Sequence, residues 1–172
     1  MRYYITLILL LFSLNIIAQT DYEVIWEEGN PRLKILKGTI DKNLIQNDTT
    51  FKWCAPNYQS YQVDSIIIKS FLKVNVANIQ FIIFAGTWCG DTQYILPKFF
   101  KLQEMSGIPD ERITLFGVDR KKIATSHIAE ALGISRIPTI IVLKGGKELG
   151  RVVEYGKTGN WDAELAEIIE RN

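Results

Sequence analysis

The sequence predicts an α/β domain in which helices cover both faces of a central mixed sheet, giving three layers. Two uninterrupted apolar runs of strand length, Ile79–Ala85 and Ile113–Val118, alternate with segments of helical spacing, as in parallel βαβ units. Farther along, Lys-Gly-Gly-Lys at 144–147 separates two strand-like segments, which is a strong hairpin signal. Parallel and antiparallel strands are therefore expected in one sheet.

The composition is that of a globular protein. The 172 residues are 47% hydrophobic and 23% charged, which suits one domain with some extra length. The formal net charge is +1, and removal of Arg2 with a leader would leave 19 basic and 19 acidic residues. A neutral chain without a basic stripe gives no reason to expect nucleic-acid binding.

Residues 1–19 are predicted to be a secretory signal peptide. Arg2 supplies the positive charge, Ile5–Ala18 forms the apolar segment, and Ala18 is a small residue at a plausible cleavage point. The alternative is an uncleaved anchor, but the run is short for a bilayer span and acidic residues follow it. We expect an exported mature chain, periplasmic or extracellular, with no membrane span once the leader is removed.

Residues 20–57 are predicted to form an N-terminal extension that packs on the main domain rather than a second domain. Glu23–Trp26 has the pattern of a short strand, and Arg32–Lys37 alternates as an exposed strand would. Asp41–Ile45 could form one helical turn. No apolar strand precedes Cys54, and Pro56 and Asn57 are predicted to lead from it into a loop.

The main domain, residues 58–172, is predicted to alternate helices and strands and to end in a helix. Pro97 lies inside the helix that follows the first apolar strand, where it removes a hydrogen bond and kinks the helix. Besides the two apolar strands, the predicted elements are helices over 64–74, 90–105, 126–132 and 161–170, and strands over 139–143 and 148–153.

The most informative segment joins the first apolar strand to the Pro97 helix. It contains Cys89 immediately before the predicted helix start, so its sulfur would lie at the helix N-terminus. Backbone amides there lack partners, and the helix dipole favours negative charge. The ionised thiolate is the reactive form of cysteine, so this position favours thiol chemistry, with the Gly90 and Asp91 amides stabilising the charge.

The order of elements and four local signatures resemble the thioredoxin-like family. The signatures are Trp88-Cys89-Gly90 at the end of a buried strand, Pro97 eight residues after the cysteine, Ile137-Pro138-Thr139 in place of the family's cis-proline segment, and glycines at 145, 146 and 156. The resemblance covers about residues 64–172. Trp-Cys-Gly-Asp followed by Thr92 also resembles a subgroup of exported bacterial thioredoxin-like proteins.

This resemblance implies a redox function, namely disulfide oxidoreductase activity with Cys89 as nucleophile on protein or small-molecule thiols and disulfides. Pro138 would shape a loop that faces the sulfur, and the backbone at Ile137 could pair with an extended substrate. Trp88 would be an exposed aromatic platform beside the cysteine, or else be partly buried against the domain.

The sequence departs from the family pattern at two positions. Thr92 replaces the second cysteine, so it cannot resolve a mixed disulfide, and Ile83 replaces a buried acid in the strand. The Thr92 hydroxyl could donate to the thiolate or be satisfied at the helix start. Asp91 suits the helix dipole, yet close to the sulfur it disfavours a thiolate.

Cys54 is the only other cysteine and has two alternative roles. It could act as the resolving thiol, which includes a disulfide with Cys89 if their Cα atoms lie within about 7 Å. It could instead be a small buried residue of the extension.

Two functions remain open. The first is a thiol–disulfide oxidoreductase that uses one cysteine; the second is a redox-inactive module that binds a protein or peptide in a cleft at Trp88 and Pro138. Peroxidase chemistry of the peroxiredoxin type is weaker, because Ile82 and Gly86 stand where that family has Pro and Thr. The sequence has no signature of a metal, haem or nucleotide site, so we expect no cofactor, and we expect a monomer.

Overall fold

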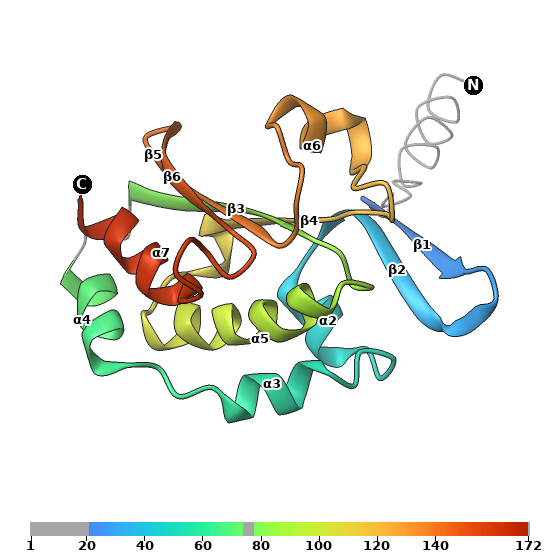
Figure 1. Cartoon of the computed structure of the whole chain (residues 1–172), viewed down its shortest axis with the longest axis horizontal. Coiled ribbons are helices and arrows are strands. Elements are labelled where there is room, and N and C mark those ends of the chain that lie inside the picture. The colour runs from blue at the N-terminus through green and yellow to red at the C-terminus, as the bar shows by residue number, and fades with distance from the viewer. Residues whose placement is uncertain (1–20, 74–77, 172) are drawn as a thin grey trace, which may run out of the picture.

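The computed structural model describes residues 21–73 and 78–171 and confirms the three-layer α/β architecture. The predicted leader lies outside these residues. Figure 1 shows α6 on one side of the sheet and α4, α5 and α7 on the other. The strands are β1 (Tyr22–Glu27), β2 (Asn30–Ile40), β3 (Ile79–Ala85), β4 (Ile113–Gly117), β5 (Thr139–Lys144) and β6 (Lys147–Val153). The helices are α2 (Lys42–Asn47), α3 (Cys54–Ser60), α4 (Ser65–Lys73), α5 (Gly90–Met105), α6 (Ile128–Ala131) and α7 (Trp161–Glu170), with short 3-10 turns at Asp110–Arg112 and Thr125–His127.

One mixed sheet has the strand order β1-β2-β4-β3-β5-β6. β3 pairs parallel with β4 and antiparallel with β5, and the other neighbours are antiparallel. Successive side chains of a strand point to opposite faces, yet Ile83 and Phe84 are both fully buried. The sheet is therefore covered on both sides at β3, which explains why that strand is apolar without alternation.

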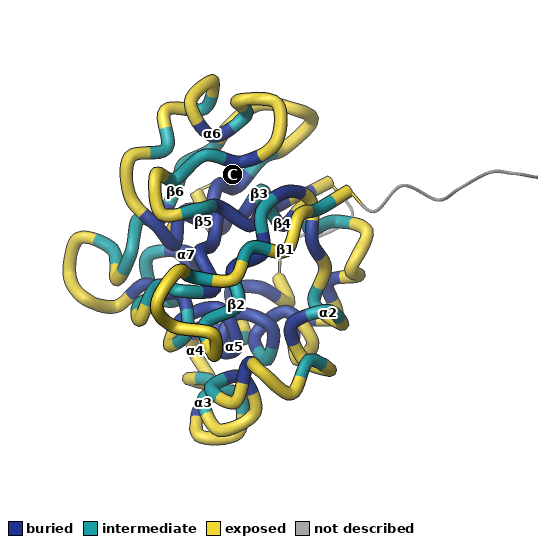
Figure 2. Tube along the Cα trace, turned by 90° about the vertical axis from the view of Figure 1, so that its right-hand side faces the viewer, coloured by how far each residue is buried: buried dark blue, intermediate teal, exposed yellow. Residues whose placement is uncertain are grey.

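The two faces of the sheet carry separate hydrophobic cores. Ile83 belongs to the core on the side of α5, whereas Phe84 belongs to the core under α6. Figure 2 shows the buried segments in the middle of the molecule and the exposed loops at its periphery. Cys54 packs in the first core and Cys89 against the second.

The N-terminal extension is part of the sheet. β1 and β2 form a hairpin, and β2 pairs antiparallel with β4, with Gly38 opposite Gly117. β2 is longer than the predicted strand over Arg32–Lys37. A Cβ at Gly117 would lie 2.3 Å from the carbonyl oxygen of Leu36, so only glycine permits this close approach of the two strands.

The predicted loop after Cys54 is wrong, because α3 begins at this residue. Pro56 lies in the first turn of the helix, where a missing N–H removes no intrahelical hydrogen bond. α3 packs beside α5. The predicted boundary between residues 57 and 58 therefore falls inside a helix, and the extension is continuous with the rest of the fold.

We predict that Gly117→Ala lowers the free energy of unfolding by about 1–3 kcal/mol, because β2 must shift to make room for the new methyl group. Urea denaturation measures the change. Gly90→Ala is the matched control, since a Cβ at that exposed position meets nothing within 4 Å, and it should be neutral or slightly stabilising. Equal stability of the Gly117→Ala variant and the wild type would contradict the proposed close contact.

Candidate functional site

Cys89 lies where the sequence predicts, between β3 and the first turn of α5. It is the N-cap residue of that 16-residue helix, with extended backbone angles and a half-buried side chain. Its amide donates to the carbonyl of Gly86, which closes a turn, and its own carbonyl accepts from Gln93. The backbone N–H groups of Gly90 and Asp91 are at the start of the helix, where no intrahelical acceptor exists. The sulfur is thus held beside a helix N-terminus whose first backbone amides have no intrahelical acceptor.

The loop that contains Pro138 faces this sulfur. The Cys89 Sγ lies 3.6 Å from the carbonyl oxygen of Ile137, and the peptide bond between Ile137 and Pro138 is cis. The carbonyl of Pro138 accepts from the amide of Glu154 at 2.7 Å, so the end of β6 holds this loop from behind. The structure therefore brings Cys89 against Ile137 and Pro138, which follow it by almost 50 positions in the sequence.

Gly86 permits the close packing of the cysteine turn against that loop. A Cβ at this position would lie 2.6 Å from Cδ1 of Ile137 and 2.9 Å from the Trp88 ring. The Thr92 side chain, which is fully buried, accepts a hydrogen bond from the Gly86 amide at 3.2 Å. The structure gives Thr92 no hydrogen bond to the sulfur. Its position agrees with the alternative in which the hydroxyl is satisfied at the helix start, rather than with donation to a thiolate.

Trp88 is half-buried rather than an open platform. Its indole N–H donates to the carbonyl of Val118 at 3.0 Å, and the Arg120 guanidinium lies 4.6 Å from the ring centroid. Glu27 in β1 forms an ion pair with Arg120 at 2.5 Å. One face of the ring is therefore covered by a cation that the N-terminal hairpin holds in place.

Thr87 connects the cysteine turn to β2. Its hydroxyl donates to the carbonyl of Lys34 at 2.8 Å and accepts from the amide of Leu36 at 3.3 Å. The sequence analysis did not identify this residue, because nothing local distinguishes it from a turn threonine.

A second connection compensates for Pro97. Proline has no N–H, so the carbonyl of Gln93 four residues earlier has no helical donor. The Asn57 side chain in α3 donates to this carbonyl at 3.1 Å and also to the carbonyl of Trp53 at 3.0 Å. The Gln93 side chain donates to the carbonyl of Thr87 at 2.9 Å. The sequence predicts that Pro97 leaves this carbonyl without a helical donor, but it does not show which side chain donates to it.

Two tyrosines that the sequence analysis missed, Tyr94 and Tyr155, lie near the start of α5. Tyr155 lies close to the Asp91 carboxylate, and its ring centroid lies 5.8 Å from that of Tyr94. Burial, followed by the Asp91 charge, raises the pKa of Tyr155, so it remains a proton donor at neutral pH. Lys98 is buried with its amine 3.3 Å from the centroid of the Tyr94 ring. This cation–π contact holds the Tyr94 ring in place against Tyr155.

The structure does not bring Cys54 to Cys89. Both cysteines are free, and they pack against cores on opposite faces of the sheet. Burial raises the pKa of the Cys54 thiol, which keeps it protonated and unreactive at neutral pH. Cys54 therefore fits the alternative of a small buried residue.

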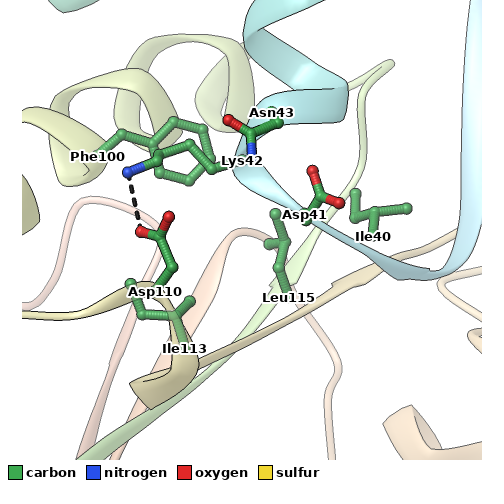
Figure 3. A pocket seen from close by; sticks show the side chains of 8 residues that line it. All are labelled: Ile40, Asp41, Lys42, Asn43, Phe100, Asp110, Ile113 and Leu115. Atoms are coloured by element: carbon green, nitrogen blue, oxygen red, sulfur yellow. Dashed lines mark hydrogen bonds and ion pairs between the residues drawn. The ribbon is translucent and has the colours of Figure 1, made fainter.

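Two other groups of ionisable side chains, around Lys42 and His127, are paired within themselves. A hollow of about 120 Å³ beside α2, shown in Figure 3, is lined by Lys42, whose amine bonds to Asp110 at 2.9 Å and to Gln103 at 3.2 Å. His127 is exposed and pairs with Glu130. Within residues 21–73 and 78–171, His, Cys, Asp and Glu side chains form no group of three that could hold a metal ion. Among the same residues, no helix combines the length and the hydrophobicity that a membrane span requires.

We predict that Thr87→Val lowers the free energy of unfolding by about 1–3 kcal/mol, because the Leu36 amide loses its acceptor in a buried position. Thermal or urea unfolding measures the effect. Thr114→Val, at an exposed position of β4, is the control for the change of side chain and should be close to neutral. If Thr87→Val is as stable as Thr114→Val, the hydrogen bonds of Thr87 to β2 do not contribute to stability.

Comparison with known proteins identifies the family. The Thioredoxin family model matches residues 65–170, from α4 to the end of α7. Thioredoxin H2-2 of Oryza sativa subsp. japonica is 33% identical over 81 residues, which are 47% of this chain and 56% of that protein, so the chain spans just over half of this relative. The thioredoxin of Alicyclobacillus acidocaldarius is 28% identical over 89 residues, 51% of this chain and 78% of that protein.

A crystal structure of a Pseudomonas aeruginosa protein of unknown function shares the fold. Its TM-score is 0.58 at 19% identity, and the match covers 77% of this chain and 93% of that one. The family model covers more than half of the chain, including the cysteine turn and the Pro138 loop. The chain belongs to the thioredoxin family.

Proposed function

We propose that this chain is an exported thiol–disulfide oxidoreductase that works through the single nucleophile Cys89. The observation that carries the proposal is the position of the sulfur, half-buried at the N-terminus of α5 and 3.6 Å from the carbonyl oxygen of Ile137. Membership of the thioredoxin family supports this class of chemistry. The export signal, the Trp-Cys-Gly-Asp-Thr subgroup and a monomeric state belong to the same proposal, on the sequence features given above.

The first step is a thiol–disulfide exchange. The Cys89 thiolate attacks one sulfur of a substrate disulfide; the substrate S–S bond breaks as the Cys89–substrate S–S bond forms. The other substrate sulfur leaves as a thiolate and takes a proton from water. The amides of Gly90 and Asp91 stabilise the attacking thiolate, and the backbone at Ile137 holds an extended substrate strand beside the sulfur.

The second step requires a thiol from outside the chain. Thr92 is buried and has no sulfur, and Cys54 lies in the core on the other face of the sheet. A small-molecule thiol, or a second cysteine of the bound protein, must therefore attack the mixed disulfide and release Cys89 as a thiolate. Substrates are accordingly protein or small-molecule thiols and disulfides.

Tyr155 offsets the repulsion between Asp91 and a thiolate at Cys89. In this proposal its neutral hydroxyl, which lies close to the Asp91 carboxylate, donates to that group and draws negative charge toward the tyrosine and away from the sulfur. The Asp91 carboxylate can then stabilise the N-terminus of α5 while it disfavours the Cys89 thiolate less. Asp91 and Tyr155 lie at the N-terminal end of α5. The family's acid lies instead in the strand, where this chain has the fully buried Ile83.

One observation favours the second candidate, a redox-inactive module that binds a peptide in the cleft at Trp88 and Pro138. Neither a cysteine at position 92 nor an acid at position 83 is present to complete the usual dithiol cycle. In that case partner capture depends on the Ile137 backbone and survives loss of the sulfur.

The test is the reaction of Cys89 with a model disulfide in a Cys54→Ser background. We expect exchange faster than that of a free cysteine derivative at neutral pH, with complete loss in Cys89→Ser. Exchange no faster than that of the free thiol, together with peptide capture by Cys89→Ser, would refute the enzymatic proposal and support the binding module.

A further prediction concerns the Tyr155 hydroxyl. Tyr155→Phe leaves the Asp91 charge unbalanced, so the pH–rate profile for alkylation of Cys89 should move to higher pH, and the rate at neutral pH should fall about two- to tenfold. Tyr94→Phe is the matched control, because it keeps the packed ring. Superimposable profiles for Tyr155→Phe and Tyr94→Phe would rule out this role.

A further inference from the structure

A second hollow, of about 480 Å³, adjoins the loop that faces Cys89. Arg136 lines it and directly precedes Ile137, and Glu154 lines it and donates its amide to the carbonyl of Pro138. Tyr155, also in its lining, lies close to the Asp91 carboxylate. The hollow and the cysteine therefore share the Pro138 loop and one tyrosine.

The backbone at this place is strained. Glu154 has a φ of 53°, a left-handed conformation that a residue with a side chain rarely adopts, and it immediately precedes Tyr155. Such strain persists only where surrounding contacts hold it, and it is enriched at ligand sites. Here it turns the chain out of β6 so that residues 154–157 line the hollow.

The charges of the hollow leave two cations available. Arg151 is fully engaged, because Glu148 accepts from it at 2.7 and 2.6 Å and the carbonyl of Leu132 at 2.8 Å. Arg136 is 68% exposed in its side chain and meets Glu154 only through one contact of 3.4 Å. The amine of Lys157 has no hydrogen bond or ion pair within residues 21–73 and 78–171.

The acidic residue on the opposite side is already neutralised in part. Glu164 accepts from the backbone amide of Lys157 at 2.7 Å and lies in the first turn of α7, where the helix dipole favours a carboxylate. The hollow is therefore better suited to an anionic group near Arg136 and Lys157 than to a cationic one.

We propose that this hollow binds a small thiol that carries a carboxylate, and that this thiol resolves the mixed disulfide at Cys89. The inference rests on the proposed function, and it supplies the external thiol that the second step requires. The carboxylate lies between Arg136 and Lys157, and the thiol reaches the sulfur past Tyr155.

The reaction balances without a further oxidant. The thiolate of the small thiol attacks the Cys89 sulfur, the bond from Cys89 to the substrate breaks, and the substrate leaves as a thiol after taking one proton. The thiolate of a second small thiol then attacks the small-thiol sulfur of the mixed disulfide with Cys89. The bond to Cys89 breaks, which frees Cys89 as a thiolate and forms the symmetric disulfide of the small thiol. The substrate disulfide is reduced to two thiols, and two small thiols are oxidised to one disulfide.

The test starts from Cys89 joined to thiopyridine by a disulfide in a Cys54→Ser background, because thiopyridine is an uncharged leaving group with its own absorbance. Its release is followed with mercaptoacetate and with the uncharged mercaptoacetamide. Each rate is divided by that of the same thiol with a free cysteine–thiopyridine disulfide, which removes differences in thiol basicity. We expect the normalised rates to favour mercaptoacetate about three- to tenfold at low salt, and less at high salt.

Variants assign this preference to the hollow. Arg136→Gln combined with Lys157→Gln should abolish it, whereas Glu154→Gln, which frees Arg136, should increase it. Lys147→Gln, at the exposed start of β6, is the control and should keep the wild-type ratio.

Equal normalised rates for the two thiols in the wild type, or a preference that survives in the double variant, would overturn the proposal while leaving the proposed function intact, provided that Cys89 still exchanges faster than free cysteine. Release no faster than from free cysteine with either thiol would reject both.

Discussion

The absence of a side chain at Gly86 is the constraint on which the site depends. A single methyl group there would collide with Ile137 and with the Trp88 ring. This glycine allows the turn after β3 to approach the loop before Pro138 closely enough for the Cys89 sulfur to contact the carbonyl of Ile137. The buried hydroxyl of Thr92 accepts a hydrogen bond from the Gly86 amide and so holds this turn in position. The reactive position is thus defined mainly by backbone groups, which change little when surface side chains vary.

Around this turn the fold uses three anchors from segments that are distant in the sequence. Thr87 bonds to β2, Asn57 in α3 satisfies the carbonyl left free by Pro97, and Arg120 covers Trp88 while pairing with Glu27. Two of the three reach the N-terminal hairpin and the third reaches α3. The extension is therefore a structural support of the cysteine turn as well as an addition to the edge of the sheet.

Local patterns predicted most of the fold and the centre of the site. The apolar run of β3, the helix with Pro97 and the position of Cys89 at its N-terminus each follow from residues close together in the sequence. The hydroxyl of Thr92 was harder to place, because its spacing from Cys89 fits contact with the sulfur as well as contact with Gly86. Only the packed structure decides between the Cys89 sulfur and the Gly86 amide as the partner of this hydroxyl.

What local patterns could not supply were the pairings across long separations. Nothing in the segment around Tyr155 shows that this residue lies close to Asp91, because its position depends on how β6 ends and on the left-handed residue before the tyrosine. Likewise, Pro56 suggested a loop after Cys54, although proline is tolerated in a first helical turn, and α3 is held there by packing on α5.

The hydrogen bonds of Thr87 have a consequence for the order in which the protein folds. They join positions 53 and 51 residues apart, so they cannot form until β2 has found its place beside β4. Contacts of such long sequence separation are slow to form, because the intervening loop must close first. Secondary structure around the cysteine would accordingly appear early in refolding, while the competent geometry of the thiol would be acquired late, in step with the docking of the first strands.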